Sequence, residues 1–301
     1  MKDITHKPES LRTAIATGKL YAPAEALQLL KDRKTEKGDA LEVARMAGIQ
    51  AVKNTPQILP FCHPVMSRAA DVTYDFQDGY VRAEASATVI NSTGVEMEAL
   101  TAVSATLLCI WDMLKPHTDQ DQMHIGEIHL LKKTGGKSHY LRQLNPAVSV
   151  GILATHPDVA SGKKPNKAAE HLRDLLQKYD FNVVEFEQCA GELQDTNQRL
   201  QAWLQKDIEL IFTVGGTGTE PTDLTVEAVE SLLTKTLPGL METARQHGQK
   251  RTPYALMSRG IGGLSGNTVI VTLPGSSAGV EESFHALRGG LLKLVSNHRV
   301  V

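Results

Sequence analysis

Residues 148–301 alternate short apolar runs with amphipathic stretches, and this order limits the possible folds more than any other feature. Three runs read as strands, SVGILAT, FNVVEFE and IELIFTVGG, and between them lie KAAEHLRDLLQKY and TNQRLQAWLQ, which read as helices. Strands that alternate with helices of about 10–15 residues are typical of βαβ units. We therefore expect an α/β domain with a mostly parallel sheet over residues 148–301.

The first half of the chain has a different texture. Residues 1–140 contain few runs typical of buried strands and one long apolar helix, expected at about 96–115. The segment LRQLNPAVS, residues 141–149, carries one proline and marks the expected boundary. A chain of 301 residues suits roughly two domains of about 100–200 residues. The predicted domains are residues 1–142 and 148–301.

The composition excludes several classes of protein. The chain is 41% hydrophobic and 22% charged, as in ordinary globular proteins, and its net charge of -2 disfavours nucleic-acid binding through bulk charge. The longest apolar runs, such as residues 107–111, are too short to cross a bilayer, and MKDITHKPES has no apolar stretch of the signal-peptide kind. We expect a cytoplasmic protein without nucleic-acid or membrane partners.

The stretch ILPFCHPVM, residues 58–66, places a thiol beside an imidazole between two prolines. The three cysteines, Cys62, Cys109 and Cys189, are too far apart for a CxxC pair or a disulfide framework. A zinc site at Cys62 and His63 needs further ligands at metal spacing, and none stands nearby. A thiolate nucleophile and a histidine held for a substrate remain as alternatives.

The segment STGVEMEALTAVSATLLCIWDMLKPH has helical periodicity on two faces. Ser92 or Thr93 is expected to cap this helix, and Pro116 to end it after Lys115. One face is apolar and the other combines small residues with carboxylates; the faces consist of Leu100, Val103, Leu107, Ile110 and Leu114, and of Glu98, Thr101, Ala105, Cys109 and Asp112.

Asp112 and Lys115 form either a solvated ion pair at i, i+3 spacing or an acid–base pair. Glu98 and Asp112 are about 21 Å apart along such a helix, so they cannot act on one reacting atom within a single subunit. Four further lysines, Lys37, Lys53, Lys133 and Lys137, are either ordinary solvated side chains or phosphate ligands. A P-loop is excluded because Leu131 occupies the position of its first glycine.

Six motifs in order, DITHKPESLRTA, KGDALEVARMAGIQAVKNT, ILPFCHPV, TGVEMEALTAVS, WDMLK and KKTGGKS, closely resemble the MoaC family over roughly residues 3–138. The resemblance implies an α+β, ferredoxin-like subunit that assembles as a hexamer. It also implies conversion of the 3′,8-cyclised dihydroguanosine triphosphate to cyclic pyranopterin monophosphate and diphosphate, with no cofactor required.

The same resemblance assigns residues to this reaction. Asp112, Lys115, Lys37, Lys53, Lys133 and Lys137 match the catalytic positions. Phe61, Cys62, His63, Met97 and Glu98 match the substrate-binding positions, although the family more often has leucine where Phe61 stands. Ring opening, ring closure and loss of diphosphate need proton transfer and neutralisation of phosphate charge, which carboxylate and lysine side chains supply. Because of the 21 Å separation, which follows from a rise of about 1.5 Å per residue, we expect a site shared between subunits.

In the second half, Gly215-Gly216-Thr217-Gly218 follows a predicted strand and is expected to present backbone amides at a helix N-terminus. The alternative is a plain connection, with Asp223 as the helix N-cap. The pieces VGGTGTEPTDLT, LPGLMETAR, MSRG and LPGSS resemble the MoaB/MogA family of Rossmann-like, molybdopterin-binding domains over about residues 148–299. The matching ligand-binding residues are Gly215, Gly216, Thr217, Gly218, Asp223, Ser258 and Ser276.

Active members of that family adenylylate molybdopterin with ATP and magnesium, but several acidic positions differ here. Thr155-His156 replaces a Ser-Asp pair, and residues 166–169 and 190–191 lack the family's acidic groups. Fewer carboxylates weaken a magnesium site, unless His156, Asp158 or Glu192 supplies a displaced ligand. A second activity as a molybdopterin adenylyltransferase, slow adenylylation and a non-catalytic molybdopterin carrier all remain open. An NAD-dependent oxidoreductase is disfavoured because no GxGxxG follows the first strand of this half.

Overall fold

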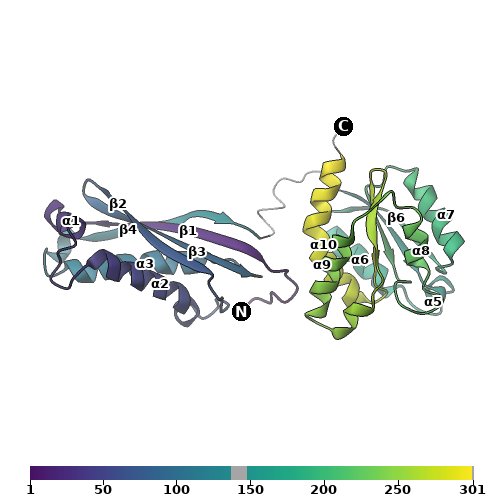
Figure 1. Ribbon diagram of the computed structural model, residues 1–301, viewed down its shortest axis with the longest axis horizontal. Helices are drawn as coiled ribbons and strands as arrows, with labels where there is room; N and C mark the ends of the chain where they lie inside the picture. The colour runs from purple at the N-terminus through teal and green to yellow at the C-terminus, as the bar shows by residue number, and fades with distance from the viewer. Residues whose placement is uncertain (137–147, 300–301) are drawn as a thin grey trace. The chain divides into compact units, whose positions relative to one another are not determined.

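The computed structural model describes residues 1–136 and 148–299 and separates into two compact units, residues 1–140 and 141–301 (Figure 1). Lys137 and most of the expected boundary segment 141–149 lie outside the described residues. Each unit has its own buried core.

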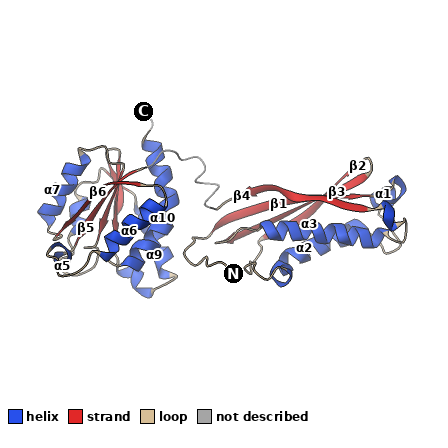
Figure 2. Cartoon of the chain, turned by 180° about the vertical axis from the view of Figure 1, so that it is seen from behind, coloured by secondary structure: helices blue, strands red, loops and turns tan. Residues whose placement is uncertain are grey.

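The first unit is a four-stranded antiparallel sheet with strand order β2-β3-β1-β4. Figure 2 shows the helices α2 and α3 running along one face of this sheet. Its elements are β1 (Ser10–Tyr21), α1 (Ala24–Lys31), α2 (Ala40–Ile58), β2 (Ala69–Gln77), β3 (Tyr80–Asn91), α3 (Glu96–Leu114), the 3-10 turn η1 (Gln120–Gln122) and β4 (His124–Thr134).

Helix α3 forms the centre of the first core. Four of the five predicted apolar residues, Val103, Leu107, Ile110 and Leu114, are fully buried, and the fifth, Leu100, is partly buried against the same core. The helix ends at Leu114, before Pro116, as predicted. Its start differs from the prediction, because α3 follows Val95 without a side-chain cap, and the Ser92 hydroxyl instead donates to the Lys7 carbonyl.

The length of α3 corrects one expectation about apolar segments. Among the described helices, α3 alone is long and apolar enough to cross a membrane by length and composition. Core helices of soluble proteins pass the same test, and half of the apolar window of α3 is buried inside this unit. Its apolar stripe packs on the sheet and on α2, so α3 is a core helix here.

Helix α2 begins at a side-chain cap and packs closely on α3. The Asp39 carboxylate accepts hydrogen bonds from the backbone N–H groups of Leu41 and Glu42, which satisfies two of the free donors at the helix start. At Gly48 a Cβ atom would lie 2.3 Å from Thr106 Oγ1, so only glycine allows the two helices to approach this closely.

The second unit is a six-stranded sheet with strand order β6-β5-β7-β10-β9-β8. The pairs β5–β6, β5–β7 and β7–β10 are parallel, and β9 pairs antiparallel with β10 and β8, so the predicted mostly parallel α/β sheet is confirmed. The strands are β5 (Ser149–Thr155), β6 (Asn182–Cys189), β7 (Leu210–Val214), β8 (Lys235–Thr236), β9 (Gly262–Ser265) and β10 (Thr268–Leu273).

Helices cover both faces of this sheet (Figures 1 and 2). One core contains Phe212 and Phe284 with α6, α9 and α10; the other contains Ile211 and Trp203 with α7 and α8. The helices are α5 (Pro157–Ala160), α6 (Lys167–Lys178), α7 (Leu193–Leu204), α8 (Thr225–Glu230), α9 (Pro238–Gln249), the 3-10 turn η2 (Pro253–Met257) and α10 (Ser277–His298).

The strand order of the second unit reverses at β5. The chain moves from β5 to β6 on one side and later to β7 on the other. Open parallel sheets bind ligands outside the carboxyl ends of their strands at such a reversal. The ends of β5 and β7, at Thr155 and Val214, are therefore where a ligand is expected.

Candidate functional site

In the first unit, three predicted catalytic side chains meet at the end of α3. Lys37 Nζ lies 2.7 Å from Asp112 Oδ2 and 3.0 Å from the Asp112 carbonyl oxygen, and Lys115 Nζ lies 2.6 Å from Asp112 Oδ1. All three side chains are exposed. The solvated i, i+3 pair considered for Asp112 and Lys115 is thus extended by Lys37 from a distant part of the chain.

A short turn holds Lys37 in this position. The Thr35 hydroxyl donates to the Gly38 carbonyl at 2.7 Å, and Gly38 has φ +102°, a backbone conformation that favours glycine. The Glu36 N–H donates to His117 Nε2 at 3.2 Å, which ties the turn to the residues after α3. The hydrogen bonds and the glycine of this turn therefore hold the Lys37 ammonium group opposite Asp112.

Ion pairing fixes the protonation state of Asp112. Hydrogen bonds from Lys115 and then Lys37 lower the pKa of Asp112 from 3.8 to about 2. The carboxylate is therefore ionised at neutral pH and accepts hydrogen bonds from both ammonium groups. This geometry suits a group that holds two lysines in place better than one that stores a proton.

The predicted substrate-binding residues gather near the other end of α3. Phe61, Cys62 and His63 lie in the loop between α2 and β2, where Phe61 is exposed and His63 is half-buried. Met97 is exposed in the first turn of α3, and the next residue, Glu98, is buried. The charge of Glu98 contributes to the raised pKa of Cys62, so the two groups interact through space.

Burial determines the chemistry of Cys62 and Glu98. Desolvation, and secondly the charge of Glu98, raises the pKa of the Cys62 thiol, so the thiolate nucleophile is disfavoured. Desolvation is also the largest cause that raises the pKa of Glu98, with the charge of Glu96 adding to it. Only 3% of Glu98 is exposed, so its carboxyl group is costly to ionise in this protomer.

Lys133 and Lys53, two further predicted catalytic residues, lie away from the Lys37–Asp112–Lys115 cluster. Lys133 pairs with Glu96 at the first turn of α3, and Lys53 is exposed on α2. Asp112 and Glu98 lie on the same straight helix, about 21 Å apart along its axis. A single chain therefore does not bring Glu98 and His63 together with the Lys37–Asp112–Lys115 cluster.

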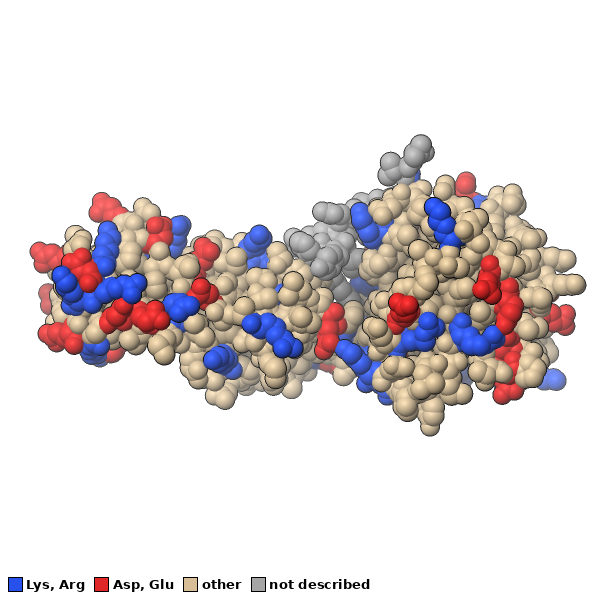
Figure 3. Space-filling model, viewed as in Figure 1, with Lys and Arg blue, Asp and Glu red and all other residues tan. Residues whose placement is uncertain are grey.

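The surface of the first unit carries both signs of charge. Figure 3 shows lysine and arginine side chains interspersed with acidic ones on the visible face. Several of these are ion pairs, such as Arg45 with Asp71 at 2.8 Å and Arg82 with Asp75 at 2.7 Å. On that face no broad basic field forms, which agrees with the net charge of -2.

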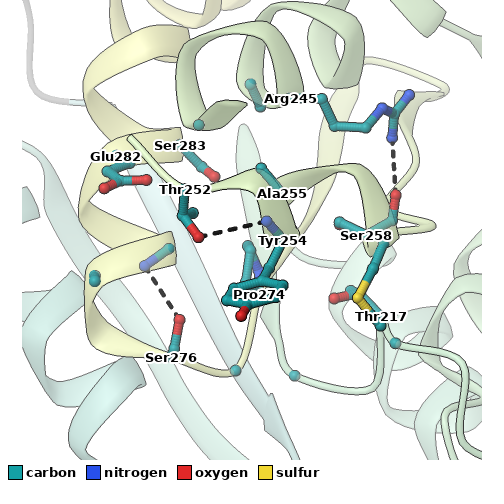
Figure 4. Close-up of a pocket in the computed structure, with 18 of the residues that line it drawn as sticks. Thr217, Arg245, Thr252, Tyr254, Ala255, Ser258, Pro274, Ser276, Glu282 and Ser283 are labelled. Carbon is teal, nitrogen blue, oxygen red and sulfur yellow. Dashed lines mark hydrogen bonds between the residues drawn. The ribbon is translucent and has the colours of Figure 1, made fainter. Parts of the chain in front are cut away.

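The second unit contains a pocket of about 670 Å³ at the carboxyl ends of its strands (Figure 4). His156 follows β5, the glycine loop of residues 215–218 follows β7, and Ser276 follows β10. Side chains from α9, η2 and α10 complete the walls. All seven residues predicted to bind molybdopterin line this pocket: Gly215, Gly216, Thr217, Gly218, Asp223, Ser258 and Ser276.

Two glycines in the loop after β7 have no substitute. Gly215 has φ +103° and Gly216 has φ +62°, in the region that L side chains rarely adopt. A Cβ atom would lie 2.6 Å from the Thr155 carbonyl oxygen at Gly215 and 2.0 Å from Thr225 Oγ1 at Gly216. The loop therefore presents bare backbone to the pocket.

The predicted helix N-terminus at this loop is wrong. Helix α8 begins at Thr225, beyond the loop, and has only six residues. The helix start that lies against the loop belongs to α10, because a Cβ atom at Gly275 would lie 3.4 Å from the Gly215 Cα. Ser276 caps α10 by accepting a hydrogen bond from the Gly279 N–H at 3.2 Å. The glycine loop and the start of α10 thus form one surface.

The N-cap alternative for Asp223 is also wrong. Helix α8 follows Leu224 without a side-chain cap, and Asp223 Oδ2 accepts a hydrogen bond from the Glu220 N–H at 2.9 Å. Ser258 ends η2, and its hydroxyl accepts a hydrogen bond from the Gly260 N–H at 3.3 Å.

Arg259 does not line the pocket but holds its glycine loop in place, a role that sequence reasoning missed. Its backbone N–H donates to the Thr217 carbonyl at 2.9 Å, and its guanidinium donates to the carbonyls of Gly218 and Asp223, both at 2.6 Å. It also pairs with Glu227 at 2.5 Å. Arg259 stands beside Ser258 in the quoted MSRG segment, but the spacing alone does not show that it spans the glycine loop.

The three residues considered as displaced magnesium ligands occupy different places in the structure. Within residues 1–136 and 148–299, no group of three or more His, Cys, Asp or Glu side chains is arranged to hold a metal ion. Of the three displaced ligands considered, Asp158 pairs with Lys164 at 2.8 Å, and Glu192 is exposed and does not line the described pocket. His156 lines the pocket, but its Nδ1 accepts a hydrogen bond from the Asp158 N–H at 3.1 Å.

Both halves match known protein families. Residues 1–136 match the MoaC family, and residues 151–293 match a family described as "Probable molybdopterin binding domain". The "Cyclic pyranopterin monophosphate synthase" of Clostridium perfringens is 47% identical over 140 residues, which are 46% of this chain and 87% of that protein. The crystal structure of MoaB from Thermus thermophilus is 34% identical and covers 50% of this chain and 97% of that one, with a TM-score of 0.47.

One similarity spans both units. The "Molybdenum cofactor biosynthesis bifunctional protein" of Chlorobaculum tepidum is 35% identical over 287 residues, which are 95% of this chain and 90% of that protein. A protein of the same description from Synechococcus elongatus is 34% identical over 301 residues, which are 96% of this chain and 94% of that protein. The chain therefore belongs to the family of bifunctional molybdenum cofactor biosynthesis proteins.

Proposed function

We propose that the first domain, residues 1–142, is a cyclic pyranopterin monophosphate synthase. It converts the 3′,8-cyclised dihydroguanosine triphosphate to cyclic pyranopterin monophosphate and diphosphate. The observation that carries this proposal is the Lys37–Asp112–Lys115 cluster, in which one ionised carboxylate holds two ammonium groups within 2.7 Å. The element order β-α-α-β-β-α-β, in which the short α1 precedes α2, and the all-antiparallel strand order β2-β3-β1-β4 support a ferredoxin-like fold for this domain.

Each member of the cluster has a proposed role. Lys37 and Lys115 neutralise the charge that develops when a ribose hydroxyl attacks the α-phosphate and diphosphate leaves. They also serve in the proton transfers that open and close the rings. Asp112, with its pKa lowered to about 2, orients both lysines and is a positioning residue for them. Lys53, Lys133 and Lys137 contribute further positive charge to the triphosphate.

The proposed site is completed by a second subunit. Asp112, Lys37 and Lys115 come from one chain, and His63, Met97 and Glu98 come from a neighbour, with Phe61 and Cys62 lining the same strip. The separation of about 21 Å along α3 supports this arrangement, because no single substrate atom reaches both ends. We propose a homo-oligomer, specifically a hexamer, located in the cytoplasm, without nucleic-acid or membrane partners.

The second domain, residues 148–301, is proposed to bind molybdopterin in the pocket at the ends of β5, β7 and β10. The bare amides of the glycine loop and the start of α10 suit its phosphate. We propose that this domain adenylylates molybdopterin slowly or not at all, because Thr155-His156 and residues 190–191 lack the acidic groups that would help to hold magnesium. A non-catalytic molybdopterin carrier is the second candidate, supported by the same donor set.

The synthase proposal is tested by incubating the purified full chain with the cyclised GTP intermediate. The expected product is cyclic pyranopterin monophosphate, detected as its fluorescent oxidised pterin together with released diphosphate. Absence of the pterin product under conditions where the substrate is stable would contradict the proposal.

The second domain is tested with the full chain, molybdopterin, ATP and magnesium. We expect molybdopterin binding with slow or undetectable diphosphate release; binding without any turnover supports the carrier. Rapid release of diphosphate that Asp223→Ala abolishes would instead show that the second domain is a full adenylyltransferase. It would contradict the proposal that adenylylation is slow or absent.

A further inference from the structure

The pocket of the second unit has two chemically different ends. One end consists of the amides of residues 215–218 and the start of α10 at Ser276, which suit an anion. Glu282 lies six residues further along α10, about 9 Å from Ser276 at the rise of an α-helix. In Figure 4 Glu282 and Ser283 lie on the opposite side of the pocket from Thr217 and Ser258.

Glu282 is the carboxylate at this second end, and nothing within the described residues neutralises it by contact. It is half-buried against the pocket, yet its side chain makes no hydrogen bond or ion pair within residues 1–136 and 148–299. Burial raises the pKa of Glu282, while the charge of Arg251 opposes this shift. An ionised carboxylate that is partly removed from water and has no direct partner raises the free energy of the folded protein. A ligand that donates hydrogen bonds to it therefore gains more binding free energy than it would from a fully solvated carboxylate.

Neighbouring charges have other partners. Glu281, one residue earlier on α10, accepts from His171 at 3.1 Å. Arg245, which also lines the pocket, donates to the carbonyls of Ser258 and Gly260, each at 3.3 Å. Two carboxylates line this pocket: Asp223 stands beside the glycine loop and accepts from the Glu220 N–H, and Glu282 is available to a molecule at the other end.

We infer that Glu282 recognises the 2-amino group and the adjacent ring N–H of a pterin, while the phosphate of the same ligand lies at the glycine loop. This inference rests on the proposed molybdopterin binding and adds the orientation of the ligand to it. The amino-pyrimidinone edge of a pterin presents two parallel donors that match a carboxylate in two-point contact. A 2-oxo pteridine presents an acceptor at one of these points and is repelled, so Glu282 sets specificity for the 2-amino group.

The test is a fluorescence titration of the full chain with neopterin monophosphate and with its 2-oxo counterpart. Ala278, exposed at the pocket, is changed to tryptophan to obstruct it, and binding that persists in Ala278→Trp is subtracted as background from other sites. The wild-type chain is expected to prefer the 2-amino probe by about tenfold or more. Glu282→Gln is expected to remove this preference and leave affinity for the 2-oxo probe nearly unchanged, whereas Glu281→Gln keeps the wild-type preference.

The outcomes separate this inference from the proposed function. Equal binding of both probes by the wild-type chain, or an unchanged preference in Glu282→Gln, overturns the role of Glu282 while molybdopterin binding stands. Failure of the wild-type pocket to bind either probe overturns the proposed binding function and the inference with it.

Discussion

The two units build their candidate sites in opposite ways. In the first unit the exposed Lys37–Asp112–Lys115 cluster lies at one end of α3, and the predicted substrate-binding residues lie near the other end, where Lys133 also pairs with Glu96. In the second unit the loops after three neighbouring strands converge on one pocket of about 670 Å³. A parallel sheet collects its loops at one edge, whereas a long helix across an antiparallel sheet separates the residues at its two ends.

This difference has consequences for assembly. A pocket completed by one chain needs no partner to bind its ligand, while residues about 21 Å apart along a helix need another subunit to act together. We therefore expect the activity of the first unit to depend on oligomerisation and ligand binding by the second unit to be independent of it. The following changes test that contrast.

The largest expected effect is on the exposed cluster of the first unit. Asp112→Asn keeps the side-chain volume but removes the charge that holds Lys37 and Lys115, so turnover of the cyclised intermediate is expected to fall by several orders of magnitude. Probe binding in the second unit is expected to stay unchanged. Asp71→Asn, which removes an exposed carboxylate paired with Arg45 at 2.8 Å, serves as the matched control and keeps its activity. Near-wild-type turnover in Asp112→Asn is incompatible with the proposed role.

The next largest effect is expected from the glycine loop of the second unit. Gly216→Ala forces a Cβ atom to within 2.0 Å of Thr225 Oγ1 and is expected to weaken neopterin monophosphate binding by about tenfold or more. Gly266→Ala is the control, because Gly266 also has positive φ, +58°, but a Cβ atom there meets nothing within 4 Å. Synthase turnover is expected to survive both changes; equal binding losses in the two variants would show that backbone strain alone is responsible.

The pH dependence of the cluster gives a third test. The pKa of Asp112 is lowered from 3.8 to about 2. The ion pairs therefore stabilise the folded cluster fully above pH 3.8, and this stabilisation is lost only as pH falls through about 2. A pH–rate profile of the wild-type chain is therefore expected to show no loss from Asp112 between pH 5 and pH 7, a range about one unit or more above its ordinary pKa. A fall in turnover between pH 7 and pH 5 that disappears in Asp112→Glu would contradict this assignment.

The smallest expected effect concerns stability rather than activity. Burial raises the pKa of Glu98 above 4.5, so the stability of the first unit decreases as pH rises from 4.5 toward the folded-state pKa. Glu98→Gln, which is neutral at every pH, is expected to raise the melting temperature at pH 7 by a few degrees and to have little effect at pH 4. Asp78→Asn, an exposed carboxyl in the turn between β2 and β3, is the control. Melting curves that show no pH-dependent gain in Glu98→Gln would indicate that Glu98 is neutralised by another group.

Local patterns in the sequence predicted much of the fold. The run SVGILAT coincides with β5, and the apolar spacing from Val103 to Leu114 predicted the buried stripe of α3. These elements follow from side-chain periodicity and from Pro116, which act within a few residues. The predicted helix starts were less accurate. Neither Ser92 nor Asp223 caps the helix that follows it, because the side chain of each makes a different hydrogen bond.

Contacts between residues far apart in the sequence could not be predicted from local sequence patterns. Lys37 and Asp112 are 75 residues apart, and Arg259 contacts the Gly218 carbonyl across 41 residues. Periodicity carries no information on such pairs, so the family resemblance supplied Lys37 and nothing supplied Arg259. The meeting of the glycine loop with the start of α10 likewise follows only from the strand order.

The central claim, that the first unit acts through a site shared between subunits, is tested most directly by mixing two inactive chains. His63→Ala and Asp112→Asn homo-oligomers are dissociated, mixed in equal amounts and reassembled, and turnover of the cyclised intermediate is measured. Random pairing in a symmetric interface restores one intact site per mixed pair, so about one quarter of wild-type activity is predicted. If subunit exchange is demonstrated and turnover stays at the level of the single variants, the shared site is contradicted.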